Sequence, residues 1–252
     1  MSLFLNKFRN FFTAVGEATL LTLQAVWFLI RKPPKLEHII GQISYIGAET
    51  LPVVLVTSFF SGGVIVVETY STFHRFNADY LLGVVVALSM ARELGPVLTA
   101  LMVVARVGSA MTAQIGTMKI TEQIDALRVL AVNPVRYLVS PRLFASTFSL
   151  PLLTIVADVV GIFGGWFVAV KLLGVNDYLF WQKMKDLVEF YDFWGGLIKA
   201  TVFGFLIAAV SCYFGFYTKG GTQGVGRATT SAVVVASMLV LIVDYFLSAL
   251  IY

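Results

Sequence analysis

Charged residues are scarce in this sequence. Asp, Glu, Lys and Arg make up 13% of its 252 residues, whereas soluble domains carry about 25%. Hydrophobic residues make up 58%, and the mean hydropathy is +0.87. This composition, with several long apolar runs, excludes an ordinary soluble domain and indicates an integral membrane protein.

Cysteine and histidine are also scarce. The single cysteine, Cys212, lies in an apolar run, so a disulfide framework or a cysteine-based metal site is not possible. The two histidines, His38 and His74, are far apart and have no neighbours with ligand spacing, so we expect no metal site. The net charge of +4 is modest and fits basic loops beside a membrane better than a nucleic-acid surface.

A nucleotide-binding motif is missing as well. The glycine-rich stretch KGGTQGVGRATT, residues 219–230, lacks the G-x-x-x-x-G-K-[ST] order of a nucleotide-binding P-loop, and no other stretch has that order. We therefore predict no catalytic residue and no cofactor in this chain. If ATP drives its work, a partner subunit must bind ATP and Mg²⁺ and hydrolyse the ATP.

Five apolar stretches are long enough to cross a bilayer as helices, which takes about 20 residues each. No low-complexity linker and no cleavable signal peptide divide the chain. The sequence thus predicts an all-α membrane domain over residues 36–252. The expected spans are Ile46–Val67, Leu81–Val107, Leu143–Val170, Leu197–Tyr217 and Ala228–Ile251.

A sixth apolar stretch, Phe11–Ile30, is flanked by basic residues at both ends. Lys7 and Arg9 precede it, and the basic run RKPPK, residues 31–35, follows it. Because basic residues favour the cytoplasmic side, both ends are expected there. For residues 1–35 we therefore predict an amphipathic helix that lies in the membrane interface instead of a span.

The distribution of basic residues also predicts the orientation. With the N-terminus in the cytoplasm, eleven basic residues fall in cytoplasmic segments and four in outside loops, and the opposite orientation reverses that bias. After five spans the C-terminus lies outside, in the periplasm. The cytoplasmic set is Lys7, Arg9, Arg31, Lys32, Lys35, Lys119, Arg128, Arg136, Arg142, Lys219 and Arg227; the outside set is Arg75, Lys171, Lys183 and Lys185.

A charged stretch, KITEQIDALRVLAVNPVRYLVSPR, occupies residues 119–142 between the second and third spans. Thr121 is expected to cap a helix that carries Glu122 and Asp125 near its start and Arg128 toward its end. From the residues alone, a solvated loop and a docking helix for a soluble partner are equally supported.

This predicted cytoplasmic helix is short and amphipathic. Ile124, Leu127 and either Leu130 or Ala131 form an apolar stripe at helical spacing. Asn133-Pro134 should end the helix, because the residue before a proline disfavours the α conformation.

Arg92 and Glu93 are adjacent charges within the second span. A charge at membrane depth is costly and usually faces a cavity or a partner, although both side chains could instead lie near the interface and snorkel. Gly95-Pro96 follows at once and is expected to kink the helix. Three isolated acids in or near apolar runs could relay protons or bond across helices, and the residues do not decide between these roles: Glu49, Asp158 and Asp244.

Two further features concern packing. Gly161 and Gly165 have the spacing that allows helices to approach closely in lipid, whereas Gly62-Gly63 is expected to loosen the first span. Residues 176–192, NDYLFWQKMKDLVEFYD, carry apolar side chains at helical spacing. They predict an amphipathic periplasmic helix between the third and fourth spans.

Three stretches together resemble the MlaE-type, or YrbE-like, permeases, the membrane subunits of ABC transporters that work with MCE proteins. They are ALSMARELGPVLTALMVVARVGSAMTAQIGTMKITEQIDAL, LAVNPVRYLVSPRLFA and GVGRATTSAVV, and the resemblance extends from about Ile39 to the end. The order of the RELGP, AQIG, TEQ-x-x-A-L, NP and SPR elements is specific. Gln114 departs from the pattern, because glutamate is frequent at this position, so no acidic role carries over to it.

The resemblance implies a homodimer that pairs with two cytoplasmic ABC ATPase subunits, often with a STAS-domain protein, and with a hexameric ring of MCE-domain proteins outside. It implies phospholipids or related lipids as substrate, the bacterial inner membrane as location and a role in outer-membrane lipid asymmetry. Arg92 and Glu93 match positions that face the lipid cavity. The segment from Thr121 to Asn133, with Glu122, Asp125 and Arg128, matches the part that contacts the ATPase.

Two other functions are compatible with the residues. An ion-coupled secondary transporter would use Asp158, Asp244 and Glu93 as a relay. However, the sequence shows no inverted repeat, and five spans are an odd number for a duplicated unit. A membrane scaffold that anchors an MCE ring would need no transport activity.

Overall fold

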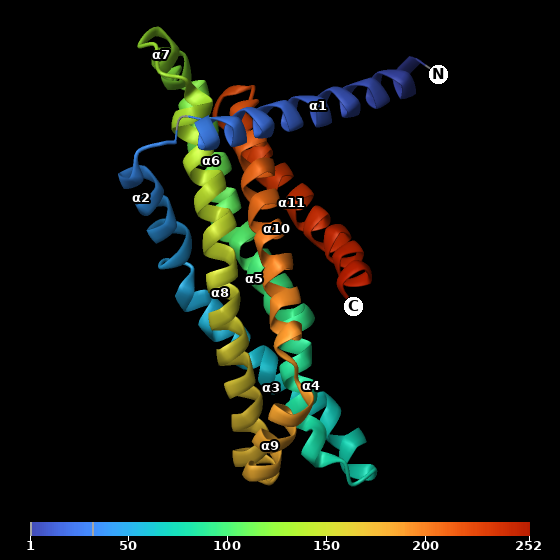
Figure 1. Cartoon of the computed structure of the whole chain (residues 1–252). Coiled ribbons are helices and arrows are strands. Elements are labelled where there is room, and N and C mark those ends of the chain that lie inside the picture. The colour runs from blue at the N-terminus through green and yellow to red at the C-terminus, as the bar shows by residue number, and fades with distance from the viewer. Residues whose placement is uncertain (1, 32) are drawn as a thin grey trace. The chain divides into compact units, whose positions relative to one another are not determined.

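The computed structural model describes residues 2–31 and 33–252, and its regular structure over these residues is helical (Figure 1). Lys32, one of the basic residues assigned to the cytoplasmic side, lies outside the described residues. The chain forms two compact units. Unit 1 comprises Met1–Ser44, Val104–Ser146 and Phe205–Leu239, and unit 2 comprises Tyr45–Val103, Thr147–Gly204 and Val240–Tyr252.

The helices follow one another with short connections. Those of the first half are α1 (Ser2–Arg31), α2 (Leu36–Gly47), α3 (Leu51–Arg75), η1 (Asp79–Leu81), α4 (Leu82–Ser89), η2 (Met90–Leu94), α5 (Gly95–Val103), η3 (Val104–Gly108) and α6 (Ser109–Ile120). Those of the second half are α7 (Gln123–Val129), η4 (Val135–Val139), α8 (Ser140–Trp166), η5 (Phe167–Leu172), α9 (Asp177–Leu187), α10 (Phe190–Phe216) and α11 (Gly221–Ile251). The short element η1 is a 3₁₀ turn, and η2 to η5 are π-helical turns, a rare winding that is frequent at functional sites.

Six helical stretches within the described residues are long and apolar enough to cross a membrane, judged by length and composition. Five of them correspond to the five predicted spans, so the all-α, multi-span fold is confirmed. The sixth lies in α1, and only 11% of its most apolar window is buried. Its length and composition also suit a span, so its placement in the interface stays a prediction. The six stretches are Phe12–Arg31, Leu36–Arg75, Asp79–Ile120, Val135–Leu172, Phe190–Phe216 and Gly221–Ile251.

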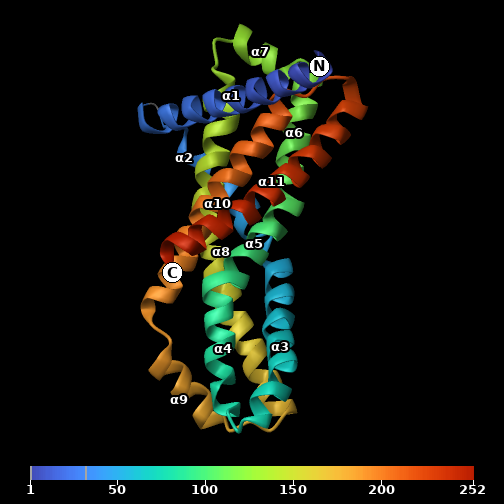
Figure 2. The ribbon, with the colours of Figure 1, turned by 90° about the vertical axis from the view of Figure 1, so that its right-hand side faces the viewer.

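Unit 1 packs around an apolar core to which α1, α6, α7, η4 and α10 contribute. Its buried members include Ala25 of α1, Ile124 of α7 and Cys212 of α10. Figures 1 and 2 both show α1 and α7 near the same end of this unit. The hydroxyl of Ser140 donates to the Ala25 carbonyl at 3.0 Å, which joins α1 to the start of α8. α1 is therefore an integral part of unit 1, whether it spans the membrane or lies along it.

Unit 2 has its own core between α3, α4, α8 and α9, with Phe180 of α9 wholly buried. α3 and α8 approach so closely that a Cβ atom on Gly62 would meet the backbone carbonyl of Gly161, and one on Gly164 would meet that of Phe59. The prediction that Gly62-Gly63 loosens the first span is wrong, because α3 is continuous from Leu51 to Arg75. The glycines instead let two helix backbones pack against each other.

The amphipathic helix predicted within residues 176–192 is confirmed as α9. Asn176 caps its start, because its side-chain oxygen accepts from the backbone N–H of Leu179 at 3.1 Å. The buried ring of Phe180 faces the unit 2 core, and Figure 2 shows α9 beside α4. α9 thus covers one end of the unit 2 bundle.

Candidate functional site

The candidate site lies in unit 2, at the π-helical turn η2 within the second predicted span. The N–H of Gly95 donates to the carbonyl of Met90, five residues back, which is π-helical winding. This turn carries both predicted site residues, Arg92 and Glu93. The structure brings them together with residues of α10 and α11 that are more than 90 positions away in the sequence.

Arg92 is held by Asp192 at the start of α10. Its Nη2 and Nε atoms lie 2.7 Å and 2.9 Å from Oδ1 of Asp192, whose side chain is buried. The backbone N–H of Glu189 donates to the other carboxylate oxygen of Asp192 at 3.0 Å. The guanidinium also lies over the ring of Tyr252, 4.7 Å from its centroid, and the Tyr252 hydroxyl donates to the Asp192 carbonyl. Arg92 therefore has a fixed position in a charge-assisted cluster.

Glu93 is held by Lys199 of α10. The Nζ atom of Lys199 lies 2.8 Å from Oε2 of Glu93 and 3.2 Å from Oδ1 of Asp244 in α11. It also donates to the Ser248 hydroxyl and to the Arg92 carbonyl, both at 2.8 Å. Lys199 is 0% exposed, so this buried ammonium has its charge and its hydrogen bonds met by groups from η2 and α11.

The ion network, defined as Arg92, Glu93, Asp192, Lys199 and Asp244, contains two cations and three carboxylates. Arg92 and Glu93 are its exposed members, because their side chains are 39% and 43% exposed, so a ligand can reach them. A guanidinium has five N–H donors, and Asp192 engages two of the groups that carry them. The remaining donors suit a phosphate or carboxylate group. The network thus has a rigid, buried base and an exposed polar rim.

At Gly95-Pro96 the winding changes from π-helical in η2 to α-helical in α5, and the kink expected there stays a prediction. A Cβ atom on Gly95 would meet Oδ1 of Asp158 in α8 and the backbone carbonyl of Met90, so glycine allows the close approach there. Asp158 is 3% exposed, and its Oδ1 atom has no hydrogen-bond partner among the described residues. The ion-coupled alternative would use Asp158, Asp244 and Glu93 as a relay. Glu93 and Asp244 both contact Lys199, whereas Asp158 lies against Gly95.

The predicted cytoplasmic helix is present in unit 1 as α7, Gln123–Val129, but its start differs from expectation. Thr121 does not cap it: the Thr121 hydroxyl donates back to the Thr117 carbonyl, and Thr121 ends α6. Glu122 occupies the cap position in the left-handed conformation, with φ of 59° and no side-chain cap bond. The reason is that α6 continues to Ile120, which leaves a tight reversal where a capped start was expected.

Charges tie α7 to α6. Asp125 lies 3.2 Å from Nζ of Lys119 and 2.8 Å from Nη1 of Arg128. Ile124 is buried in the unit 1 core and Leu127 packs against it, which confirms these two members of the predicted apolar stripe. The third predicted member, Leu130 or Ala131, is wrong, because both residues are exposed. Val129 is 87% and Leu130 is 71% exposed, so these two apolar side chains point away from the core. α7 is therefore an anchored helix with an exposed apolar end.

α7 ends four residues before the predicted stop. The chain turns at Ala131, which has φ of 56°, so the expectation that Asn133-Pro134 ends the helix is wrong. The Asn133 side chain instead accepts from the backbone N–H groups of Val135 and Arg136, at 3.0 Å and 3.3 Å. Asn133 thus begins η4 rather than ending α7.

Sequence reasoning missed four residues of the site: Asp192, Lys199, Ser248 and Tyr252. Lys199 carried a usable signal, because it is a lone basic residue inside the expected span Leu197–Tyr217, and an intramembrane charge has a partner by default. Ser248 and Tyr252 carried none, since a hydroxyl near the end of an apolar helix is common. Their roles depend on which helices meet η2.

The fold and the site define an α-helical membrane protein with several membrane-spanning helices and an ion network that has a buried base. The profile of the family described as Permease MlaE matches residues 39–250. The chain belongs to the MlaE permease family.

Relatives are similar over almost the whole chain. A probable ABC transporter permease protein of Rickettsia typhi is 44% identical over 96% of this chain and 94% of its own length. The intermembrane phospholipid transport system permease protein MlaE of Haemophilus influenzae is 38% identical over 96% of this chain and 94% of its own length. The chloroplastic protein TRIGALACTOSYLDIACYLGLYCEROL 1 of Arabidopsis thaliana is 37% identical over 82% of this chain and 59% of its own length.

Proposed function

We propose that this chain is the permease subunit of an ATP-driven ABC transporter that moves phospholipids or related lipids. The family match over residues 39–250, together with a relative named as a phospholipid transport permease, carries the proposal. The chain works as a homodimer in the bacterial inner membrane, with its N-terminus in the cytoplasm and its C-terminus in the periplasm. An MCE-domain ring exchanges lipid with it, a STAS-domain protein accompanies the ATPase, and the complex maintains outer-membrane lipid asymmetry.

The shape of α7 supports a contact with a partner ATPase. Its buried residue Ile124 and the ion pair between Asp125 and Lys119 fix the helix to unit 1. Val129 and Leu130 then present apolar surface at its end. An exposed apolar pair on a fixed helix suits a groove on a partner. Movement of the partner would be passed to α6 through the ion pair between Asp125 and Lys119.

The ion network supports binding of an amphiphile's polar head. A lipid needs apolar surface for its tails and a polar group for its phosphate, and Arg92 offers exposed donors at a fixed position. The network's buried base keeps that position defined, because Lys199 holds both η2 and α11.

Reconstitution with the partner tests the proposal. The tagged chain should copurify with an ATPase that carries a P-loop, and proteoliposomes of that complex should move a labelled phospholipid when ATP is added. A Walker-site mutation in the ATPase should stop this movement. Lipid movement that continues unchanged in the Walker mutant would refute an ATP-driven mechanism.

The ion-coupled alternative has one observation in its favour, because Glu93 and Asp244 share Lys199. It predicts lipid or solute movement driven by a proton gradient without ATP. The same proteoliposomes, with a pH gradient imposed and nucleotide omitted, distinguish the two mechanisms.

A further inference from the structure

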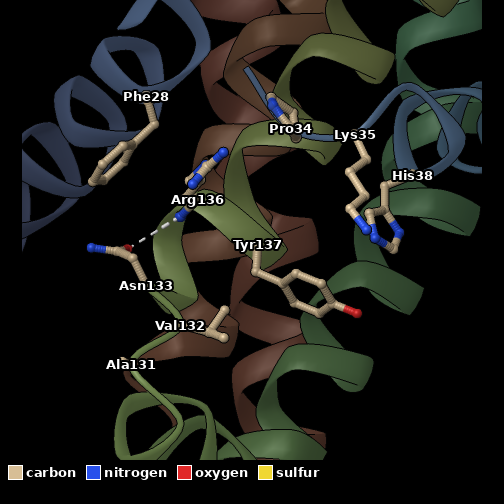
Figure 3. Close-up of a pocket in the computed structure, with 9 residues that line it drawn as sticks. All are labelled: Phe28, Pro34, Lys35, His38, Ala131, Val132, Asn133, Arg136 and Tyr137. Atoms are coloured by element: carbon tan, nitrogen blue, oxygen red, sulfur yellow. Dashed lines mark hydrogen bonds between the residues drawn. The ribbon is translucent and has the colours of Figure 1, made fainter. Parts of the chain in front are cut away.

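A cavity of about 680 Å³ opens in unit 1, and no residue of the ion network is among those that line it. This volume is in the range of small-molecule sites. Figure 3 shows that its walls come from the end of α1, the start of α2 and the segment from Ala131 into η4. The lining residues are Phe28, Pro34, Lys35, His38, Ala131, Val132, Asn133, Arg136 and Tyr137.

The polar side of this cavity is basic. Lys35 projects from the segment just before α2, His38 from the first turn of α2, and Arg136 from η4 (Figure 3). None of the described residues that line it is acidic, and Glu37 is not among them although it adjoins His38 in the sequence. A lysine, an arginine and an imidazole ring around a single cavity favour an anionic ligand, above all a phosphate group.

Local contacts hold these side chains in place. The Asn133 side chain accepts from the N–H groups of Val135 and Arg136, which fixes the turn that carries Arg136. An Nη2 atom of Arg136 lies 3.5 Å from the Pro33 carbonyl, which connects η4 to the segment that carries Lys35. The rings of His38 and Tyr137 meet edge to face at 5.2 Å. Contacts across the cavity wall therefore connect η4 to α2 and to the segment before it.

The cavity lies where apolar helices begin and end. Stretches long and apolar enough to cross a membrane end at Arg31 and start at Leu36 and Val135, and the lining residues cluster around these three points. Trp27 is 48% exposed, and the Cζ atom of Arg31 lies over its ring, 5.0 Å from the ring centroid. An exposed tryptophan beside basic residues is typical of the headgroup layer of a bilayer. Phe28, Pro34 and Val132 add an apolar wall, so the cavity suits an amphiphile.

We propose that this cavity binds the phosphate headgroup of an anionic membrane phospholipid, as a site separate from the ion network. Lys35 and Arg136 contact the phosphate, His38 lies at its edge, and the apolar wall contacts the glycerol and upper acyl chains. The leaflet concerned is the cytoplasmic one if the orientation given under the proposed function holds; the binding itself does not depend on transport. Anionic lipid would then bridge α1, α2 and η4 and stabilise unit 1.

Native mass spectrometry of the purified chain tests this site. The chain is titrated with phosphatidylglycerol, with phosphatidylcholine of the same acyl chains, and with inorganic phosphate. The pocket variant is Lys35→Gln with Arg136→Gln, and the matched control, Lys183→Gln with Lys185→Gln, removes the same charge from α9. Val132→Trp is a second variant that fills the cavity and keeps its charges.

We expect tighter binding of phosphatidylglycerol than of phosphatidylcholine, and a loss of about tenfold or more in the pocket variant, because each cation beside a lipid headgroup adds several-fold to affinity. Val132→Trp should weaken binding as well, and the control should not. Equal binding of the two lipids, or an equal loss in pocket variant and control, would overturn the proposal. If inorganic phosphate binds as tightly as phosphatidylglycerol, the site is for free phosphate and the lipid assignment is wrong. Each of these results is independent of ATP and of lipid movement, so none of them bears on the proposed function.

Discussion

Lys199 and Glu93 form a salt bridge of 2.8 Å across two helices, and the lysine side chain is completely buried. Removing one member of a buried ion pair costs about 3–5 kcal/mol, because the other charge is left uncompensated. Here one lysine compensates two carboxylates, those of Glu93 and Asp244. We therefore expect Lys199 to contribute strongly to the stability of unit 2.

Lys199→Met should lower the stability of the protein by about 3–5 kcal/mol. The measurement is thermal denaturation of the purified chain in detergent. As a control, Lys199→Met combined with Glu93→Gln and Asp244→Asn removes both stranded charges and should recover most of the loss. An unchanged melting temperature for Lys199→Met alone would show that the network does not stabilise the fold.

Substitutions at Arg92 should separate binding from folding. Arg92→Glu would abolish transport, but it also places a second carboxylate beside the buried Asp192, 2.7 Å from the present guanidinium, so it should destabilise unit 2 as well. Arg92→Gln with Asp192→Asn keeps the pair neutral and the fold intact. This double variant should melt like the wild type and lose lipid movement in proteoliposomes. Normal movement in a well-folded double variant would exclude Arg92 from the substrate site.

The exposed end of α7 should be needed for coupling. Val129→Asp with Leu130→Asp replaces side chains that are 87% and 71% exposed, so unit 1 should fold normally while the ATPase no longer copurifies. Asp125→Asn is the matched control for folding, since it weakens the ion pairs with Lys119 and Arg128 without touching the apolar pair. Full copurification of the ATPase with the double variant would place the contact elsewhere.

Charge reversal tests the ion pairs of α7. Asp125→Lys with Arg128→Glu restores an opposite pair between these positions but sets the introduced ammonium group beside that of Lys119. We expect lipid-stimulated ATP hydrolysis by the reconstituted complex to fall while the complex stays assembled. Undiminished hydrolysis would show that the ion pairs are not part of the coupling.

Glycine substitutions should distinguish close packing from open surface. A Cβ atom at Gly62 would meet the Gly161 carbonyl, so Gly62→Ala should force α3 and α8 apart and lower the melting temperature. The control is Gly226→Ala in α11, where nothing lies within 4 Å of the new methyl group. Since alanine favours helix over glycine by about 1 kcal/mol, this control should leave stability unchanged or slightly higher. Equal melting of the two variants would contradict the close approach of the helices.

The positions of the long helices could be predicted from the sequence, because hydrophobic length alone determines which segments can cross a bilayer. The helix α9 could be predicted for a similar reason, since its apolar residues repeat at helical spacing. Predictions from short sequence motifs failed where a neighbouring helix engaged the residue on which the motif depended. Thr121 is a good cap residue, but α6 runs up to it and turns its hydroxyl back toward Thr117.

The partners of Arg92 and Glu93 could not be predicted, although both residues could be singled out by their cost in a membrane. Asp192 and Lys199 lie about one hundred positions away, and only the packing of α10 and α11 against η2 brings them near. The apparent isolation of Asp244 in the sequence was misleading for the same reason. A charge inside an apolar segment indicates that a partner exists and does not identify it.

The hydrogen bond from Lys199 to the backbone carbonyl of Arg92 has a mechanical consequence. That carbonyl lies within a π-helical turn, so its direction depends on how the helix is wound there. If η2 tightened to α-helical pitch, the carbonyl would rotate away from the ammonium, and the side chains of Arg92 and Glu93 would turn with it. The winding of η2 and the contacts of Lys199 with it are therefore coupled. A pull along the helix axis would change the winding and these contacts together.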